Sequence, residues 1–124
     1  MVEELLQSWE SVEEDQPIPL LARRLIKGDK AIVANVKLSK GCHVKRHSHP
    51  SEQISCVISG RAKWTIGFDG ETYELETTHG QVLRLPANFP HEVVALEDTE
   101  VFDVLSPPGP MGVDTIGAAS MQTT

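Results

Sequence analysis

Three histidines and one glutamine have the spacing of metal ligands. His47 and His49 are two residues apart, and on a β-strand such side chains point to the same face. Imidazole is the commonest metal ligand in proteins, so two on one face can bind one ion. Gln53 follows four residues later, and His91 lies downstream of a second group of turn residues. We therefore predict a metal site formed by His47, His49, Gln53 and His91; the alternative is a set of solvated histidines.

The predicted ligands are all neutral, and this determines the chemistry of the ion. Three imidazoles and one amide leave a divalent ion its full positive charge, so it can polarise a bound carbonyl, hydroxyl or water. Glu52 is a rival ligand, because a carboxylate binds divalent ions better than an amide, but Gln53 has the strand parity of the histidines. We expect one divalent transition metal ion (Zn, Ni, Fe or Mn), since these ligand types do not select among the four.

Asp103 is the candidate catalytic residue. It lies in an apolar segment with the parity of Val101 and Leu105, where a carboxylate is costly unless it is partnered or functional. We expect it to act as a general acid or base, or else to be a hydrogen-bonded structural carboxylate. His43 and Lys45 share the parity of the histidines, so we expect them to line the same face, where Lys45 either attracts an anionic substrate or is simply solvated.

The segments around these residues predict short β-strands. Apolar side chains alternate over 31–38, 54–58, 62–68, 91–95 and 101–105, and Asp69-Gly70 is a hairpin signal. Many short strands separated by turns are typical of an all-β barrel or double-sheet jelly roll. We assign an N-terminal arm to 1–19, the barrel to 20–107 and a C-terminal tail to 108–124. The tail has no strand periodicity, so we expect it to be extended or mobile.

The N-terminal arm carries an apolar stripe at helical spacing, formed by Val2, Leu5, Leu6 and Trp9. We expect a short helix or turn that covers one mouth of the barrel or forms a subunit contact. Open antiparallel sheets have edge strands that need covering. The arm and the tail can supply that cover in a homodimer, which we predict.

Composition excludes several classes of protein. A chain of 124 residues, 40% of them hydrophobic, is one domain that can bury a core. A formal charge of −7 argues against nucleic-acid binding, which needs a basic surface. The acidic N-terminus lacks a long apolar run, so we expect no signal peptide, no membrane span and a cytoplasmic location. Cys42 and Cys56 make no disulfide framework; we expect reduced thiols, with Cys56 in the core.

The two halves of the metal pattern resemble the motifs of the cupin superfamily. The first motif is matched at every spacing by Gly41, His47, His49, Gln53 and Gly60, although Gln53 stands where the superfamily has Glu. The second is matched by Gly80, Pro86 and His91, with Asn88 in place of a Gly and Ala95 in place of an Asn. The resemblance covers about residues 20–107 and implies a cupin jelly-roll barrel with one metal ion.

The segments 47–54 and 102–108 are similar to the KdgF-type small cupins, as is Trp9-Glu10-Ser11-Val12. That resemblance implies a metal bound by three His and one Gln, and it implies a catalytic Asp at Asp103. Members of this family convert cyclic unsaturated uronates to linear ketonised sugars, using in addition a Phe and an Arg. Leu105 and Gly109 stand at these two positions. Without the Arg, the chain cannot form a bidentate ion pair with a uronate carboxylate there.

From the residues and the resemblance we expect a metal-dependent small cupin that acts on a small, oxygen-rich, sugar-acid-like metabolite. The expected reaction is Lewis-acid-assisted proton transfer, with Asp103 moving the proton. Two alternatives stay open. One is a cupin dioxygenase, and the other is a non-catalytic cupin that binds or senses a small molecule.

Overall fold

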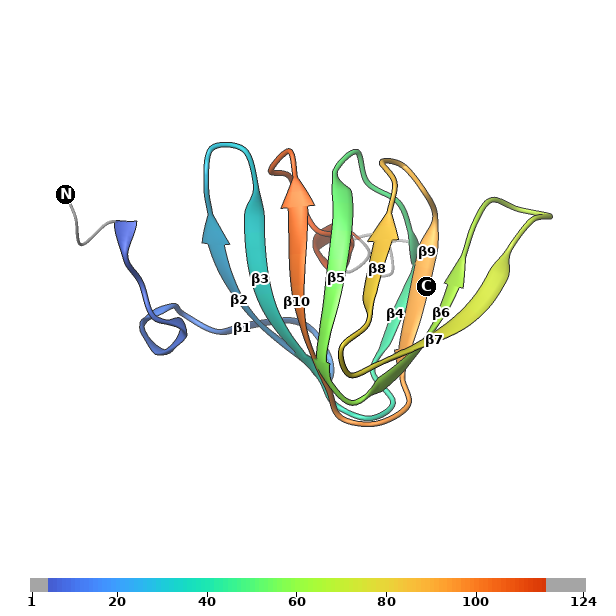
Figure 1. The fold of residues 1–124 in the computed structure, drawn as a ribbon, viewed down its shortest axis with the longest axis horizontal. Coiled ribbons are helices and arrows are strands. Elements are labelled where there is room, and N and C mark those ends of the chain that lie inside the picture. The colour runs from blue at the N-terminus through green and yellow to red at the C-terminus, as the bar shows by residue number, and fades with distance from the viewer. Residues whose placement is uncertain (1–4, 116–124) are drawn as a thin grey trace.

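The structure is a computed structural model that describes residues 5–115. Nearly all of the regular structure in this part of the chain is β-strand, as the sequence predicts (Figure 1). A 3-10 turn, η1 (Trp9–Ser11), precedes the strands. The strands are β1 (Asp15–Ile18), β2 (Leu21–Lys27), β3 (Ile32–Leu38), β4 (His43–His47), β5 (Glu52–Ser59), β6 (Arg61–Ile66), β7 (Tyr73–Thr78), β8 (Val82–Leu85), β9 (His91–Ala95) and β10 (Thr99–Ser106).

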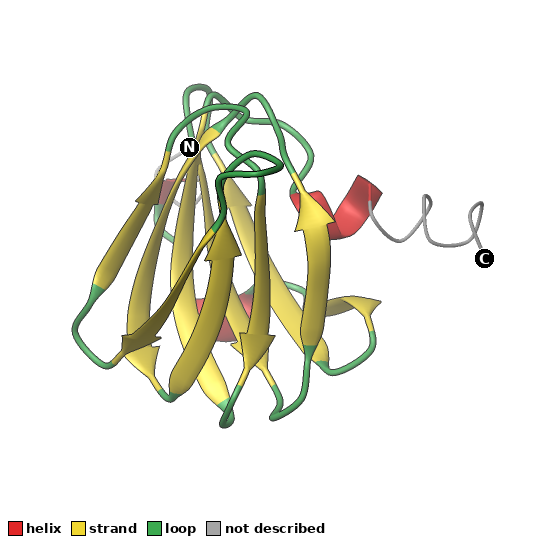
Figure 2. Ribbon diagram, turned by 90° about the vertical axis from the view of Figure 1, so that its right-hand side faces the viewer, coloured by secondary structure: helices red, strands yellow, loops and turns green. Residues whose placement is uncertain are grey.

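The strands form two antiparallel sheets of a jelly-roll barrel. The larger sheet has the order β1-β2-β3-β10-β5-β8, and the smaller has the order β4-β9-β6-β7. Figure 2 shows the strands side by side, with loops gathered at the two ends of the barrel. Neighbours in a sheet are often distant in sequence, such as β3 and β10, which is typical of this architecture. No helix within residues 5–115 is long and apolar enough to cross a membrane.

The alternation predicted for 31–38 and 101–105 is confirmed, and it defines the inner face of the larger sheet. Ile32, Ala34, Val36 and Leu38 are all buried. Across the ladder, Val101, Asp103 and Leu105 pair with Val36, Ala34 and Ile32 and are buried as well. Asp103 is thus buried on the inner face of the larger sheet, between Ala34 of β3 and Ser55 of β5.

The inner face of β5 is the more polar of its two faces. Gln53, Ser55 and Val57 are buried, whereas Cys56 is only half-buried on the outer face. The expectation that Cys56 is a core residue is therefore wrong, and Cys42 is the buried thiol. The inner positions of β5 carry the polar groups of the metal motif. A hydrophobicity pattern alone would therefore assign the outer, more apolar face of β5 to the core.

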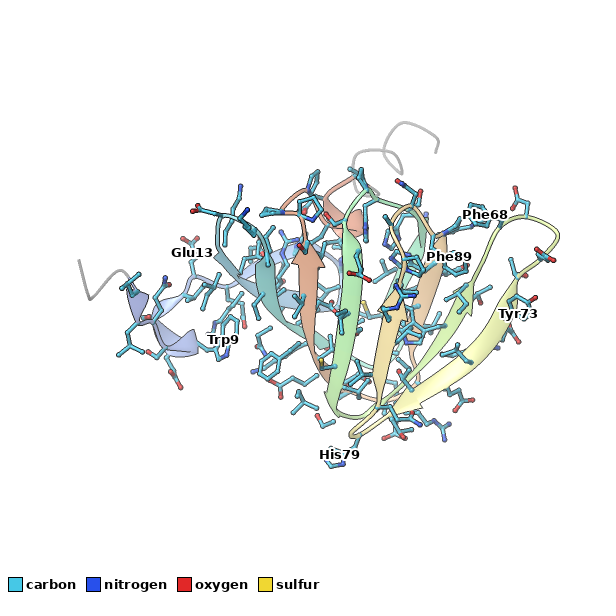
Figure 3. The ribbon with its side chains drawn as sticks, turned by 45° about the horizontal axis from the view of Figure 1, so that its top comes forward. Trp9, Glu13, Phe68, Tyr73, His79 and Phe89 are labelled. Atoms are coloured by element: carbon cyan, nitrogen blue, oxygen red, sulfur yellow. The ribbon has the colours of Figure 1, made fainter. Side chains whose placement is uncertain are left out.

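The N-terminal arm follows the outside of the larger sheet and does not close a mouth of the barrel. Trp9, labelled in Figure 3, stacks on Phe102 with a centroid distance of 5.8 Å. Phe102 alternates with the buried Val101 and Asp103, so it lies on the outer face of β10. The segment assigned to the arm also contains β1, an edge strand, which tolerates Pro17 because one side of an edge needs no backbone donor. Of the apolar stripe, Leu5 and Leu6 are exposed, and Val2 lies outside the described residues.

Candidate metal centre

Four side chains from three strands and one connection form the candidate site. The strand ends that carry them lie at one end of the barrel, the upper end in Figure 1. His47 ends β4, His49 lies in the β4–β5 connection, Gln53 is near the start of β5, and His91 starts β9. The nitrogen atoms that His47, His49 and His91 offer lie within 4.8 Å of one another. Strand pairing explains the arrangement, since His47 is the direct partner of His91 in the β4–β9 ladder.

Each histidine ring is fixed by a hydrogen bond to a backbone carbonyl. Nδ1 of His47 contacts the Lys45 carbonyl at 2.7 Å, Nδ1 of His49 contacts that of Ser51 at 2.8 Å, and Nδ1 of His91 contacts that of Phe89 at 2.8 Å. Since a carbonyl only accepts, Nδ1 carries the proton and donates it in all three rings. Nε2 therefore has a free lone pair, which is the outer-shell arrangement found around metal-binding histidines.

The free lone pairs fit a cation. Nε2 of His91 is buried and has no hydrogen-bond partner among the described residues. Nε2 of His49 lies 3.0 Å from Oε1 of Gln53, so two acceptors face each other. A positive ion between them would make both contacts favourable, and adjacent ligands each about 2.1 Å from one ion have separations of this size. The three-histidine cluster thus fits a metal ion.

The electrostatic surroundings favour the neutral forms of His47 and His91. Burial, followed by the neighbouring His47, lowers the pKa of His91 to about 4. Burial is also the largest cause that lowers the pKa of His47, and the Lys45 carbonyl only partly offsets it. A neutral imidazole is the form that binds metal, so these rings do not need to lose a proton near neutral pH.

Gln53 and Glu52 point to opposite faces of β5. Gln53 is buried against His49, while Glu52 is half-buried and forms an ion pair with Arg84 at 2.9 Å. The structure thus places the amide, not the carboxylate, beside the histidines, as strand parity predicts.

The expectation that His43 and Lys45 line the same face as the histidines is wrong. Both are exposed, and Nε2 of His43 forms a hydrogen bond with the carboxylate of Glu92 on the outer surface. The register of the β4–β9 ladder shifts between Val44 and His47. Such a bulge adds a residue to one strand and reverses the alternation, so the inward parity of His47 does not extend back to Lys45. His79 is exposed in the β7–β8 turn (Figure 3).

Asp103 is buried in the same cavity as the metal centre. The cavity wall includes His47, Gln53, His91 and Asp103. Burial raises the pKa of Asp103 to about 6, against the opposing effects of Ser55, Gln53 and His49. Its Oδ1 is buried without a hydrogen-bond partner in the part of the chain described. A carboxyl oxygen with an unused lone pair beside a candidate metal site can exchange a proton with a bound ligand.

The rest of the cavity is mainly apolar, and three of its residues come from the tail. Met111, Gly112 and Val113 are buried and line it. For residues 111–115, which are helical from Gly112 and buried at 111–113, the expectation of an extended or mobile tail is therefore wrong; residues 116–124 lie outside the described part. The apolar residues Met111 and Val113 are too few to give a readable periodicity, so the sequence analysis missed them. The other apolar residues of the cavity are Leu21, Val36, Leu38, Val44, Ala62, Trp64, Val93 and Val101.

The departure from the second cupin motif at Asn88 has a structural reason. Asn88 has a φ of 63°, in the left-handed region where Gly is favoured and Asn is the best-tolerated alternative. Its N–H donates to the His49 carbonyl at 2.8 Å. Asn88 therefore keeps the turn that presents His91 and ties it to the loop of His49.

A jelly-roll barrel with three clustered histidines that could bind a metal ion is the architecture of the cupin class. The model of the cupin domain (Cupin_2) matches residues 34–106, which is more than half of the chain. The chain belongs to the cupin family.

Solved structures give the same result. The chain is similar to KdgF from Halomonas sp., at 25% identity and a TM-score of 0.69, with 81% of this chain and 92% of that chain covered. An RmlC-like cupin from Shewanella frigidimarina has 22% identity and a TM-score of 0.72, with 83% and 90% covered. Oxalate decarboxylase from Bacillus subtilis, a protein with Mn(II) centres, has 18% identity and a TM-score of 0.77. It aligns with 95% of this chain, which spans only 37% of its length, and these last two likenesses concern the fold alone. No curated protein matches the chain.

The contact between His49 and Gln53 leads to a first prediction. Gln53→Ala should weaken metal binding at least about tenfold. Loss of a residue that only supports a ligand typically costs about 10–100-fold, and loss of a direct ligand should cost at least as much. Titration of the metal-free protein with Zn²⁺ against a competing chelator measures the change. Glu52→Ala is the matched control, since it removes the adjacent outward side chain and should leave the affinity within about twofold of the original. Equal losses in both variants would contradict the role of Gln53.

Proposed function

We propose that this cupin is a metal-dependent enzyme that transfers a proton on a small oxygen-containing metabolite. The observation that carries the proposal is Asp103, a buried carboxyl group with a free Oδ1 in the wall that also contains His47, Gln53 and His91. In a purely structural role, a carboxylate at this depth would be expected to have both oxygens satisfied.

The proposed roles follow from the chemistry of each group. His47, His49, Gln53 and His91 would hold a divalent ion, which supplies a Lewis acid that polarises a carbonyl or hydroxyl oxygen. Oδ1 of Asp103 accepts the proton released from the polarised substrate and returns it at another atom. Ser55 and Gln53 lie beside the carboxyl group and favour its ionised form, against the effect of burial. The apolar wall excludes water, which otherwise competes for the proton.

The cavity walls bear on the class of substrate. Apart from the metal-centre residues, the polar side chains that line the cavity are Ser55, Thr99 and Asp103. A polyhydroxylated sugar acid needs a hydrogen-bond partner for most of its hydroxyl groups when it is buried. We therefore favour a smaller keto or hydroxy acid with a short hydrocarbon part over a uronate. Leu105 and Gly109 stand where the KdgF-type cupins have Phe and Arg, which also argues against a uronate. The carboxylate of a short keto or hydroxy acid would instead have to bind the ion itself.

An activity screen tests the proposal against the two alternatives. The metal-loaded protein is offered short keto and hydroxy acids and unsaturated uronates, while product formation and dissolved oxygen are followed together. We expect conversion without oxygen uptake. Oxygen consumption coupled to turnover would identify a dioxygenase instead. Saturable binding without conversion would identify a binding or sensing protein, an alternative that the largely apolar cavity also supports.

We also propose that the chain forms a homodimer. Leu5 and Leu6 are 81% and 80% exposed on the arm, and Val82 is 62% exposed on the edge strand β8. Exposed apolar side chains and unpaired strand edges are surfaces that association covers. Light scattering at micromolar concentration should give twice the chain mass of 13.6 kDa. A particle with the mass of one chain would contradict the proposal.

A further inference from the structure

The C-terminal segment 111–115 lies against the metal centre. It begins a helical turn at Gly112, and Figure 1 shows this turn behind β10 and β5, on the inner side of the larger sheet. A methyl group on Gly112 would lie 1.9 Å from Cδ2 and 2.1 Å from Nε2 of His47. The backbone of Gly112 therefore covers the edge of His47 that carries its free lone pair.

The segment is held there by a buried arginine. Arg23, from the inner face of β2, has a side chain only 5% exposed and forms ion pairs with Asp114 and Asp15, each at 2.9 Å. Each carboxylate accepts two hydrogen bonds from the guanidinium. Burial disfavours the charge on Arg23, but the hydrogen bonds and charges of the two aspartates outweigh it and raise its pKa. Arg23 thus joins the tail to the barrel through Asp114 and to β1 through Asp15.

Other contacts show that the segment is fitted to this position. Asp114 also accepts a hydrogen bond from the N–H of Met111 at 3.0 Å, which closes the helical turn. The sulfur of Met111 lies 3.6 Å from Nη1 of Arg23. Just before the tail, the Ser51 hydroxyl donates to the Pro107 carbonyl at 2.5 Å. The chain is therefore anchored at Pro107 and again at Asp114, and residues 111–113 between these anchors line the cavity.

We propose that residues 111–115 are a lid over the metal centre, latched by the Arg23–Asp114 ion pair, and that ligands reach the histidines when this latch opens. The proposal rests on the metal site described above and extends it to the control of access. Asp114 is the part of the latch that moves, because its side chain is 36% exposed while that of Arg23 is buried. When Asp114 leaves, Arg23 keeps Asp15 as its partner, so opening does not leave a buried charge unpaired.

The two aspartates on Arg23 provide a matched pair of variants. Asp114→Asn weakens the latch, whereas Asp15→Asn weakens the same arginine's other ion pair and leaves the lid attached. Each protein is loaded with Zn²⁺, and the rate of release to an excess of a coloured chelator is measured. We expect Asp114→Asn to release Zn²⁺ about 10- to 100-fold faster than the original chain, the range for loss of a charge-assisted hydrogen bond. Asp15→Asn should change the rate less than about threefold. Equal rates in the two variants would overturn the latch.

Glycine 112 provides a second, independent test. Gly112→Ala should speed Zn²⁺ release with the ion pair intact, because the added methyl group cannot fit beside His47. Gly109→Ala is its control, since the methyl group there meets only the Ser51 hydroxyl oxygen at 3.4 Å, an ordinary contact distance. A Gly112→Ala protein that releases Zn²⁺ as slowly as Gly109→Ala would show that the segment does not cover His47.

A thiol at position 113 tests the lid without any metal. Val113 is 6% exposed, so the thiol of Val113→Cys should react slowly with a thiol reagent. The reaction of Cys42 and Cys56, measured in the original chain, is subtracted. Adding Asp114→Asn should accelerate that reaction about 10- to 100-fold, and adding Asp15→Asn should not. If the protein binds no Zn²⁺ while this difference persists, the metal site is wrong and the lid stands. If the added thiol reacts equally fast in all three proteins, the lid is wrong.

Discussion

Replacing Asp103 by asparagine should lower turnover about 10²- to 10⁴-fold, the usual contribution of a general acid or base. Asparagine keeps the shape of the side chain and its hydrogen-bonding capacity but cannot accept the proton at Oδ1. Metal content should not change, because Asp103 is not among the four proposed ligands. The measurement is kcat on the best substrate from the activity screen, together with the metal content of each preparation.

Asp69→Asn is the control for this experiment. Asp69 is 91% exposed in the β6–β7 hairpin, paired with Arg46, and its loss should leave turnover unchanged. A folded, metal-loaded Asp103→Asn protein with full activity would contradict the proposed proton transfer. The binding or sensing alternative would then be the better account of this cupin.

The same substitution should also change how stability depends on pH. The pKa of Asp103 is raised by burial from 3.8 to about 6 in the folded protein. Between these values the folded chain holds a proton that the unfolded chain has lost, so the free energy of unfolding falls as pH rises through this window. The loss is complete above about pH 6 and amounts to at most about 3 kcal/mol. Asp103→Asn has no carboxyl group at this position and so lacks this loss. The free energy of unfolding of the variant should therefore rise relative to that of the original chain as pH rises.

Urea unfolding of the metal-free proteins at about pH 4 and about pH 7.5 measures this effect. The expected result is a stability difference that favours Asn more at the higher pH. This pattern identifies a carboxylate kept at the cost of stability, which is typical of functional groups. If Asn instead becomes the less stable variant as pH rises, the ionised carboxylate is stabilised by its surroundings and Asp103 has a structural role.

The sequence predicts much of the fold because the relevant signals are local. Alternation along 31–38 and 101–105 identifies β3 and β10 and puts Asp103 on the inner face with Val101 and Leu105. The spacing of the histidines around turn residues likewise predicts which side chains meet. The first half of the motif marks the end of β4 at His47, and the second half marks the start of β9 at His91. The outward direction of Glu52 follows from the same period of two.

What the sequence analysis missed depends on non-local structure or on a break in periodicity. The bulge between Val44 and His47 reverses the parity of His43 and Lys45, and no residue type marks it. The ion pair between Arg23 and Asp114 joins residues 91 apart, so no local pattern contains both. One signal was available, because Arg23 has the inward parity of the buried Leu21, and an inward arginine needs a partner.

The most direct test of the metal centre is the metal content of the folded protein. The original chain and His91→Ala are each saturated with Zn²⁺, freed of excess ion by gel filtration, and analysed for metal and protein. His79→Ala is the control, because His79 is exposed and remote from the site. We expect about one ion per chain in the original and in His79→Ala, and almost none in a folded His91→Ala protein. Equal metal content in all three proteins, or no bound metal in the original chain, would contradict it.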